Sequence, residues 1–289
     1  MGRIVYFLHV VGMLFLFSSC IKEDMEKCPI YIVKVYVKDK NYSNIDNVLH
    51  LKKRDENLPY REYIGTIYYQ LSDIKTGRVV AEKFEETMIN NEQFYTISFD
   101  NISQGDYNLT VWGNISSETA TGTLHNGGNE LTDLYVVSKN LSFTSEYSSD
   151  QLMLERAKGD LLLVCSNFPP GITRVEEKIS SLYDSVDPYL KYAGNTTVIK
   201  TGPVKSLIEA SLAPSVTNGN SKLNLRFSSD TVSMPSDDLI IPEIPLIMNR
   251  NQVTVVEVNY NKITGGLEIW TYVNDEWIMI HHLDILNAK

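Results

Sequence analysis

Apolar and polar residues alternate along most of the chain after residue 30, and this pattern predicts a protein built from β-strands. In the run Tyr31–Val37, Tyr31, Val33, Val35 and Val37 occupy every second position. A period of two is typical of a half-buried strand, because successive side chains point to opposite faces. The same alternation predicts strands at 94–99, 107–111, 222–228 and 256–260.

Turn residues divide the remaining apolar runs into further short strands. Gly77 separates two such runs and predicts a hairpin, while Gly105 and the pair Gly265-Gly266 each precede another strand. The runs that these and other turn signals separate are 64–74, 79–84, 131–137, 161–165 and 267–271.

Two segments depart from simple alternation. Thr173 and Glu176 have the spacing of a helix capping box, and apolar residues near helical spacing follow, so we expect a helix over 173–186. Near the C-terminus, residues 277–280 are apolar on both faces of the expected strand. A strand of that kind is typically buried on both sides, in its own sandwich or in a partner's groove.

Many short strands, spaced about a dozen residues apart with turns between them, predict an all-β chain of two antiparallel β-sandwiches in series. The pattern restarts at Arg156–Gly159, where a buried-type run follows. We therefore expect an N-terminal sandwich over 30–157 and a C-terminal sandwich over 158–289.

The first 19 residues have the three parts of a secretory signal peptide. Arg3 supplies the positive charge, an apolar run covers 4–17, and the small residues Ser18 and Ser19 follow. The apolar run is shorter than the roughly 18 residues that a membrane-spanning helix needs, and His9 interrupts it. A cleaved signal over 1–19 is therefore expected.

Cys20 follows the small residues directly, and Phe17-Ser18-Ser19-Cys20 resembles the lipobox of bacterial lipoproteins. Phe17 stands where the family usually has leucine. The resemblance implies cleavage before Cys20 and acylation of its thiol, with chains such as palmitate that bind the protein stably to a membrane. A plain secretory signal is the competing interpretation. Residues 20–29 would then form a lipidated linker.

Lys22, Glu23 and Asp24 lie immediately behind the lipid site. A charged run of this kind is commonly a solvated linker. The three residues also resemble the surface-export signal of Bacteroidetes lipoproteins. That resemblance implies a position on the outer face of the outer membrane.

The charge balance excludes a nucleic-acid-binding protein. The chain carries 36 acidic and 26 basic side chains, and its formal net charge is −10. Binding to phosphates requires clustered lysine and arginine. The one basic cluster, Lys52-Lys53-Arg54, lacks interleaved aromatic residues. Together with Arg61, it is instead a candidate site for a protease.

Two cysteines, Cys28 and Cys165, remain besides Cys20. Export through an oxidising compartment permits a disulfide between them. Cys165 also ends the apolar run 161–165, which favours a small buried side chain. No two cysteines have the spacing of a zinc site.

The sequence contains no recognisable catalytic motif. A nucleophile elbow, a zinc-binding His-Glu-x-x-His, a phosphate loop and a dinucleotide fingerprint are all missing. His281 and His282 are adjacent, so on a strand they point to opposite faces and cannot share a metal. We expect no enzyme activity, no metal and no cofactor.

The order of several loose motifs resembles the fimbrium-anchor lipoproteins of Bacteroidetes type V pili. Cys20 is followed by an acidic spacer and by Cys28-Pro29 leading into a strand, and Gly105-x-Tyr107 opens a strand that ends in Trp112-Gly113. The family implies two transthyretin-like sandwiches without catalysis, at the base of a pilus, with fimbrial shaft subunits as partners. It also implies that the tethered subunit keeps its strand 31–37.

Two other functions compete with this one. The three tryptophans and seventeen tyrosines could serve a surface glycan-binding lipoprotein, although such residues commonly pack a sandwich core. A hydrolase with two carboxylates far apart in sequence is the third. An exposed aromatic row would favour glycan binding, and carboxylates clustered in a cleft would favour the hydrolase.

Overall fold

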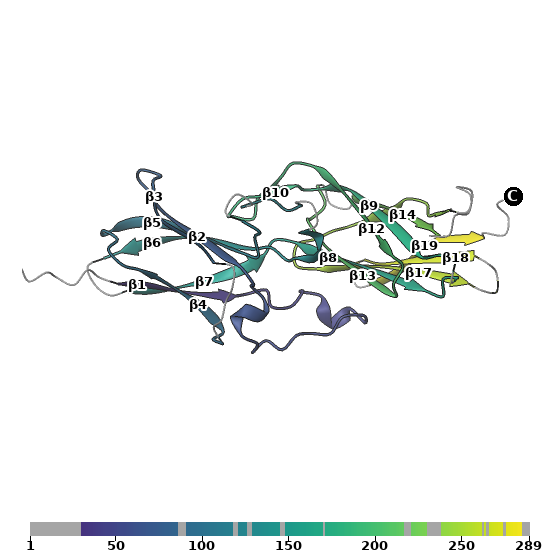
Figure 1. Cartoon of the computed structure of the whole chain (residues 1–289), viewed down its shortest axis with the longest axis horizontal. Helices are drawn as coiled ribbons and strands as arrows, with labels where there is room; N and C mark the ends of the chain where they lie inside the picture. Colours follow the sequence, from purple (N-terminus) through teal and green to yellow (C-terminus); the bar gives the residue numbers. More distant parts are fainter. Residues whose placement is uncertain are drawn as a thin grey trace, which may run out of the picture.

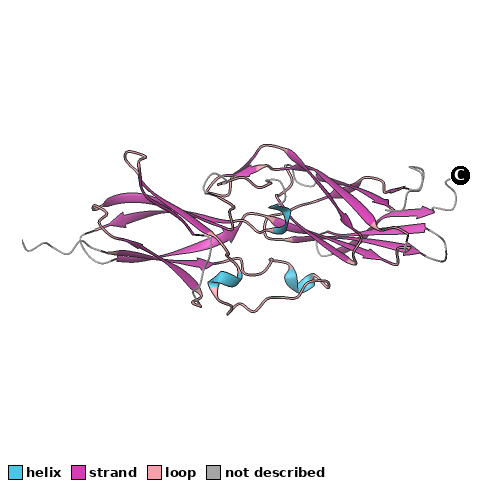
Figure 2. Ribbon diagram, viewed as in Figure 1, coloured by secondary structure: helices cyan, strands magenta, loops and turns pink. Residues whose placement is uncertain are grey.

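The structure is a computed structural model that describes residues 30–85, 91–117, 121–125, 129–144, 148–169, 171–216, 221–229, 238–261, 263, 266–273 and 276–284. These residues form an elongated molecule of two β-rich halves, with only short 3-10 turns besides the strands (Figures 1 and 2). No helix among them is long and apolar enough to cross a membrane. The predicted all-β fold class is confirmed.

The N-terminal half is one seven-stranded sheet that folds into two layers. Strands β6 and β7 pair over only two residue pairs, so the sheet bends there and β4-β1-β7 faces β3-β2-β5-β6. Between the layers lies a core of aromatic and branched side chains. The strands are β1 (Tyr31–Val37), β2 (Ile67–Asp73), β3 (Val79–Glu85), β4 (Phe94–Phe99), β5 (Gly105–Gly113), β6 (Tyr135–Phe143) and β7 (Ser148–Arg156).

Strand β1 occupies an interior position in this sheet. It pairs with β4 on one side and with β7 on the other. Tyr31, Val33, Val35 and Val37 are each at most 2% exposed, so the predicted alternation is present in full. The pairing with β7 is parallel, whereas antiparallel sandwiches were expected. The second half likewise has one parallel pair, β8 with β17.

The C-terminal half is a sandwich of two sheets, ordered β12-β9-β14-β15 with β16 also on β14, and β13-β8-β17-β18-β19. A small pair, β10 (Ser185–Val186) and β11 (Tyr192–Ala193), flanks them. The sheet strands are β8 (Gly159–Ser166), β9 (Arg174–Leu182), β12 (Thr196–Pro203), β13 (Leu207–Leu212), β14 (Ser221–Ser228), β15 (Leu239–Ile240), β16 (Ile244–Leu246), β17 (Val253–Asn261), β18 (Gly266–Val273) and β19 (Glu276–Asp284).

The expected helix over 173–186 is wrong, because this segment contains strand β9. Val175, Glu177 and Ile179 are buried at every second position. Ser181 has a left-handed φ of 61°, and the pairing with β12 shifts register there, which returns Leu182 to the core. Because the bulge at Ser181 shifts the alternation by one residue, the apolar positions of this strand resemble the spacing of a helix.

The halves meet at a buried junction. Strand β7 ends at Arg156 and β8 begins at Gly159, so the expected boundary at 157 falls between them. A Cβ atom on Gly159 would lie 2.2 Å from the carbonyl oxygen of Asn249, a distance that only glycine avoids. Arg156, Ala157 and Lys158 are each at most 3% exposed.

The segment between β1 and β2 reinforces the junction. It contains two 3-10 turns, η1 (Ile45–Asn47) and η2 (Tyr60–Glu62), and runs beside the second sandwich (Figure 1). The side chain of Asn44 accepts a hydrogen bond from Val253 N and donates one to Val253 O, both at 2.9 Å. Val48 packs with Leu162 and Val255 on the outer face of β8 and β17.

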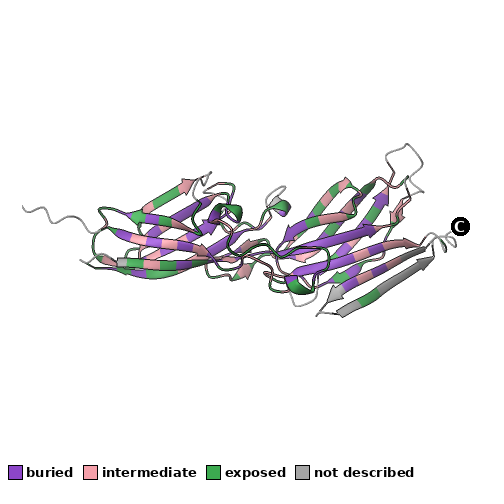
Figure 3. Cartoon of the chain, turned by 90° about the horizontal axis from the view of Figure 1, so that it is seen from below, coloured by how far each residue is buried: buried purple, intermediate pink, exposed green. Residues whose placement is uncertain are grey.

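The hydrophobic core crosses the boundary between the halves. Tyr68, Trp112 and Leu134 of the first half belong to the same buried cluster as Leu161 and Val256 of the second. Buried positions therefore continue through the middle of the molecule (Figure 3). The two sandwiches therefore pack against each other through a shared hydrophobic core.

Candidate functional site

Most of the sequence-predicted site residues lie outside the described part of the chain. This holds for Cys20, for Lys22, Glu23 and Asp24, and for Cys28. Lipid attachment and surface export therefore stay predictions.

The other predicted site residue, Cys165, lies in the core of the second sandwich. Its side chain is 7% exposed, and burial together with Glu177 raises the pKa of the thiol to about 12. No described residue forms a disulfide with it. Pairing with Cys28 is untested, and the buried environment is that of a small hydrophobic side chain.

The basic cluster is exposed but held in place. Arg54 donates its backbone N–H to Asn41 Oδ1 at 2.8 Å, and its carbonyl accepts a hydrogen bond from Asn41 Nδ2 at 3.1 Å. Its guanidinium lies 4.6 Å from the centre of the Tyr63 ring. These contacts hold Arg54 through its backbone and its side chain, and cleavage at this cluster stays a prediction.

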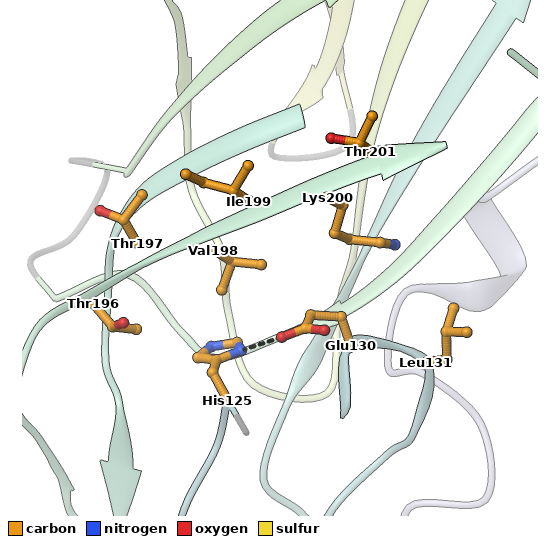
Figure 4. Close-up of a pocket in the computed structure, with 9 residues that line it drawn as sticks. All are labelled: His125, Glu130, Leu131, Thr196, Thr197, Val198, Ile199, Lys200 and Thr201. Atoms are coloured by element: carbon orange, nitrogen blue, oxygen red, sulfur yellow. Dashed lines mark ion pairs between the residues drawn. The ribbon is translucent and has the colours of Figure 1, made fainter. Parts of the chain in front are cut away.

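A groove runs along strand β12 in the second sandwich (Figure 4). Its volume is about 490 Å³. One wall consists of six consecutive residues of β12, and the other comes from the segment before β6; the lining residues are His125, Glu130, Leu131, Thr196, Thr197, Val198, Ile199, Lys200 and Thr201. Consecutive residues of a strand line one groove only where that groove follows the strand's edge.

The edge of β12 is open along this groove. Strand β12 ends its sheet and pairs with β9 alone among the named strands. Alternate N–H and C=O groups of such a strand point away from the sheet. Val198 is buried, whereas Ile199 on the opposite face is 60% exposed. An added strand would find backbone partners together with a place for an inward side chain.

The neighbouring edge of β13 is closed. The backbone N–H of Ala213, just after β13, donates to His125 Nε2 at 3.2 Å, and the turn η4 (Asn129–Leu131) packs against the same strand. Lys200 Nζ spans from β12 to the carbonyl oxygen of Glu209 on β13 at 2.7 Å. The groove therefore offers one free strand edge beside a capped one.

His125 and Glu130 form the floor of the groove. Their side chains are 6% and 10% exposed, and Nδ1 lies 3.8 Å from Glu130 Oε1 (Figure 4). Burial and the nearby positive charge of Lys158 lower the pKa of His125 to about 4. The imidazole is then neutral at pH 7, so this contact is not an ion pair there. A neutral imidazole suits its role as acceptor for Ala213.

The sequence patterns above did not single out strand β12. Its segment 196–201 contains five β-branched residues among six, which is the composition of a strand. No sequence signal distinguishes an end strand from an interior one here. No group of three or more metal-ligating side chains occurs among the described residues.

The C-terminal strand forms a second open edge. Strand β19 ends the other sheet and pairs with β18. Ile278 and Met279, neighbours on opposite faces, are each 45% exposed, so β19 is not buried on both sides within its own sandwich, and its burial in a partner's groove stays a prediction. An end strand lacks the neighbour that would cover them.

Comparisons with known proteins support the fold. No family model matches the chain, and no curated protein matches its sequence. A candidate adhesin from Bacteroides thetaiotaomicron matches with a TM-score of 0.58 and 14% identity, over 89% of this chain and 100% of that one. Candidate polysaccharide-binding proteins from the same species match with a TM-score of 0.53 and 10% identity, over 88% of this chain and 98% of that one.

A more distant structure is the fimbrial anchor protein Mfa2 from Porphyromonas gingivalis. It matches with a TM-score of 0.46 and 14% identity, over 87% of this chain and 100% of that one. At identities this low, the likeness to the two Bacteroides structures establishes a shared fold.

Proposed function

We propose that this chain is a non-catalytic subunit of a cell-surface fimbrium, joined to its neighbours through strand-mediated contacts. Lipid on Cys20 holds it to the outer membrane, and Lys22, Glu23 and Asp24 direct it to the outer face. Its partners are fimbrial shaft subunits, and its place is the anchor at the base. The fold shared with a candidate adhesin agrees with a cell-surface role.

The observation that carries this proposal is the open edge of β12 beside its groove. Addition of a strand to a sheet edge gives affinity through main-chain hydrogen bonds and specificity through pockets for alternate side chains. The groove supplies both, with a free backbone edge on one side and a buried floor at His125. A neighbouring subunit with an extended segment fits this arrangement.

The position of β1 supports an anchor over a shaft subunit. Its inward residues are fully buried between two neighbouring strands. Removing β1 would separate β4 from β7 and open the first core to water, at a cost of several buried side chains of about 1.5–3 kcal/mol each. A subunit tethered through its N-terminus keeps this strand.

Site-specific photo-crosslinking in fimbriated cells tests the docking surface. Ile199 lies at the β12 edge with 60% exposure, and Ile240 lies in β15 at the other end of the same sheet with 70% exposure. A benzophenone side chain at 199 is expected to form an adduct with another fimbrial subunit. The same group at 240 is the matched control and is expected to form none.

Equal adducts at both positions, or no adduct at 199 in cells that carry fimbriae, would contradict a docking site at β12.

A further inference from the structure

A second groove lies on the other sheet of the C-terminal sandwich, away from the β12 edge. It has a volume of about 410 Å³ and is lined by Leu49, His50, Glu257, Asn259 and Trp270. Trp270 and its partners come from strands β17 and β18, whereas Leu49 and His50 come from the long segment before β2. The groove therefore exists only because that segment folds over the second half.

Strand pairing places the polar and aromatic groups on one surface. Glu257 and Trp270 are direct cross-strand partners, so their side chains share a face. The adjacent Ile269 is fully buried in the core, which puts Trp270 on the outer face. Asn259 lies two residues along β17 from Glu257 and thus on the same face. Met279, the β19 partner of Trp270, extends this surface and is 45% exposed.

The polar side chains of the groove are oriented by their neighbours but keep hydrogen-bonding groups available for a ligand. Asn259 Oδ1 accepts hydrogen bonds from Ser166 Oγ at 2.9 Å and from Asn167 Nδ2 at 2.8 Å. These contacts fix the amide so that its Nδ2 is left to donate elsewhere. The Glu257 side chain forms no ion pair or hydrogen bond with another described residue. Such groups beside an aromatic ring are typical of a ligand site.

We infer that this groove binds a neutral hexopyranose unit of a glycan. The flat C–H face of a pyranose packs on an indole ring, and its hydroxyl groups both donate and accept hydrogen bonds. Glu257 accepts from hydroxyl hydrogens, and Asn259 Nδ2 donates to a hydroxyl oxygen. Leu49, which is 85% exposed, lines the same groove. This inference does not depend on the fimbrial role.

Charge selects a neutral sugar over an acidic one. Glu257 would lie against any carboxylate of a uronic or sialic acid, and the chain has a formal net charge of −10. Two like charges at close range in a partly buried groove repel. None of the described lining residues is an arginine or lysine that would offset this repulsion.

Binding to defined oligosaccharides tests the inference. The probes are hexamers of glucose (α-1,4 and β-1,4), β-1,4-mannose and β-1,4-galactose, with the hexamer of α-1,4-galacturonate as the acidic comparison. Calorimetry with the protein should detect binding of at least one neutral hexamer and none of the galacturonate. Trp270→Ala should weaken that binding at least tenfold. Tyr189→Ala, which removes a ring 61% exposed outside the groove, should leave it unchanged.

Glu257→Gln provides a second, independent readout that does not alter the ring. It should weaken binding of the neutral hexamer several-fold and raise binding of the galacturonate hexamer, because the repelling charge is gone. The inference is overturned if no neutral hexamer binds at millimolar concentration, or if folded Trp270→Ala binds as the wild type does. If circular dichroism shows that Trp270→Ala is unfolded, the test rests on Glu257→Gln. Unchanged binding of both the neutral and the galacturonate hexamer by that variant overturns the inference.

Discussion

Individual side chains at the junction show how charged groups are accommodated in the interior. The guanidinium of Arg156 lies 3.9 Å from the centre of the Tyr42 ring, donates to Tyr135 Oη at 2.8 Å and pairs with Asp133 Oδ2 at 3.1 Å. Burial alone would lower the pKa of Arg156, but Asp133 and the two tyrosines raise it overall. Satisfied partners of this kind are the condition for a buried charge.

Arg156→Ala should therefore destabilise the protein strongly. It leaves Asp133 without its ion pair and Tyr135 Oη without this donor, and loss of one partner of a buried pair costs about 3–5 kcal/mol. Urea unfolding at pH 7 measures the change. Lys139→Ala, which breaks the exposed pair with Asp150, is the control and should change the free energy of unfolding by under about 1 kcal/mol.

His125 should make the protein sensitive to acid. Its pKa is about 4 in the folded protein and 6.5 in a model peptide. Between these pH values the unfolded chain binds the proton and the folded chain does not, so stability rises with pH across this window. The loss on acidification is on the order of 3 kcal/mol.

His125→Gln keeps an acceptor for Ala213 but cannot titrate, so it should flatten the dependence of unfolding free energy on pH between 4 and 6.5. His50→Gln, at an exposed position, should retain the wild-type slope. An unchanged slope in His125→Gln would refute this assignment.

Among the strands, position within a sheet separates a structural role from the proposed binding role. Strand β1 is interior and is part of the core, whereas β12 and β19 each end a sheet. Between β12 and β19, it is β12 that is bordered by a groove with a buried floor. The geometry thus favours docking at β12 over docking at the C-terminal strand.

Deletion of residues 276–289 distinguishes docking at β12 from docking at β19. Because β19 pairs with β18 at the end of its sheet, and Ile278 and Met279 are half exposed, we expect the second sandwich to stay folded. Fimbriae should remain on the cells, since the β12 groove is intact. Immunoblots of cells and medium measure the distribution of fimbriae. Shedding into the medium with a folded second sandwich would move the docking surface to β19.

At the scale of the whole molecule, the proposed tether at Cys20 precedes the first half of the chain, whereas the proposed docking groove lies in the second half. Tyr31 begins β1 at the outer end of the first sandwich, while β1 runs toward the junction (Figure 1). The groove lies in the second sandwich. Between them, Arg250 Nη1 pairs with Asp39 Oδ2 at 3.3 Å and with Glu155 Oε2 at 3.0 Å, which joins the halves firmly. With the proposed tether and docking site, this arrangement would hold a partner at a distance from the membrane.

Cys20→Ala should release the protein from the membrane, or leave it with its signal peptide uncleaved. The acyl chains on Cys20 are the proposed anchor, and their burial contributes about 0.8 kcal/mol per CH₂ group. Fractionation of cells into soluble and detergent-extracted material measures the effect. Cys165→Ala is the matched control and should stay with the membrane. Membrane retention of processed Cys20→Ala would refute the lipid anchor.

Replacing Lys22, Glu23 and Asp24 together by alanine should keep the protein lipidated but hide it from the outside of the cell. The triplet is proposed to act as a sorting signal that directs the protein to the surface, and it does not bind the membrane itself. Digestion of intact cells with added protease measures exposure. Replacing Glu26 and Lys27 by alanine is the control and should leave exposure unchanged. Undiminished digestion of the triple variant would contradict the export signal.

The sequence alone determined the signals that depend on local pattern. Strands β1 and β4 begin and end where alternation predicted, because one buried face imposes a period of two. The hairpin at Gly77, with a left-handed φ of 70°, also follows from local geometry. The proposed N-terminal export signals are local patterns too, and other proteins would recognise them.

The tertiary structure decided whatever depends on neighbours distant in the chain. Whether 174–182 is a helix or a strand was settled by β12 and β14 on either side of it. Which strand ends a sheet, and so exposes a backbone edge at β12, follows from the order of strands and not from their composition. The Trp270 groove likewise needs Leu49, more than two hundred residues away, because contacts between remote segments leave no periodic trace in the sequence.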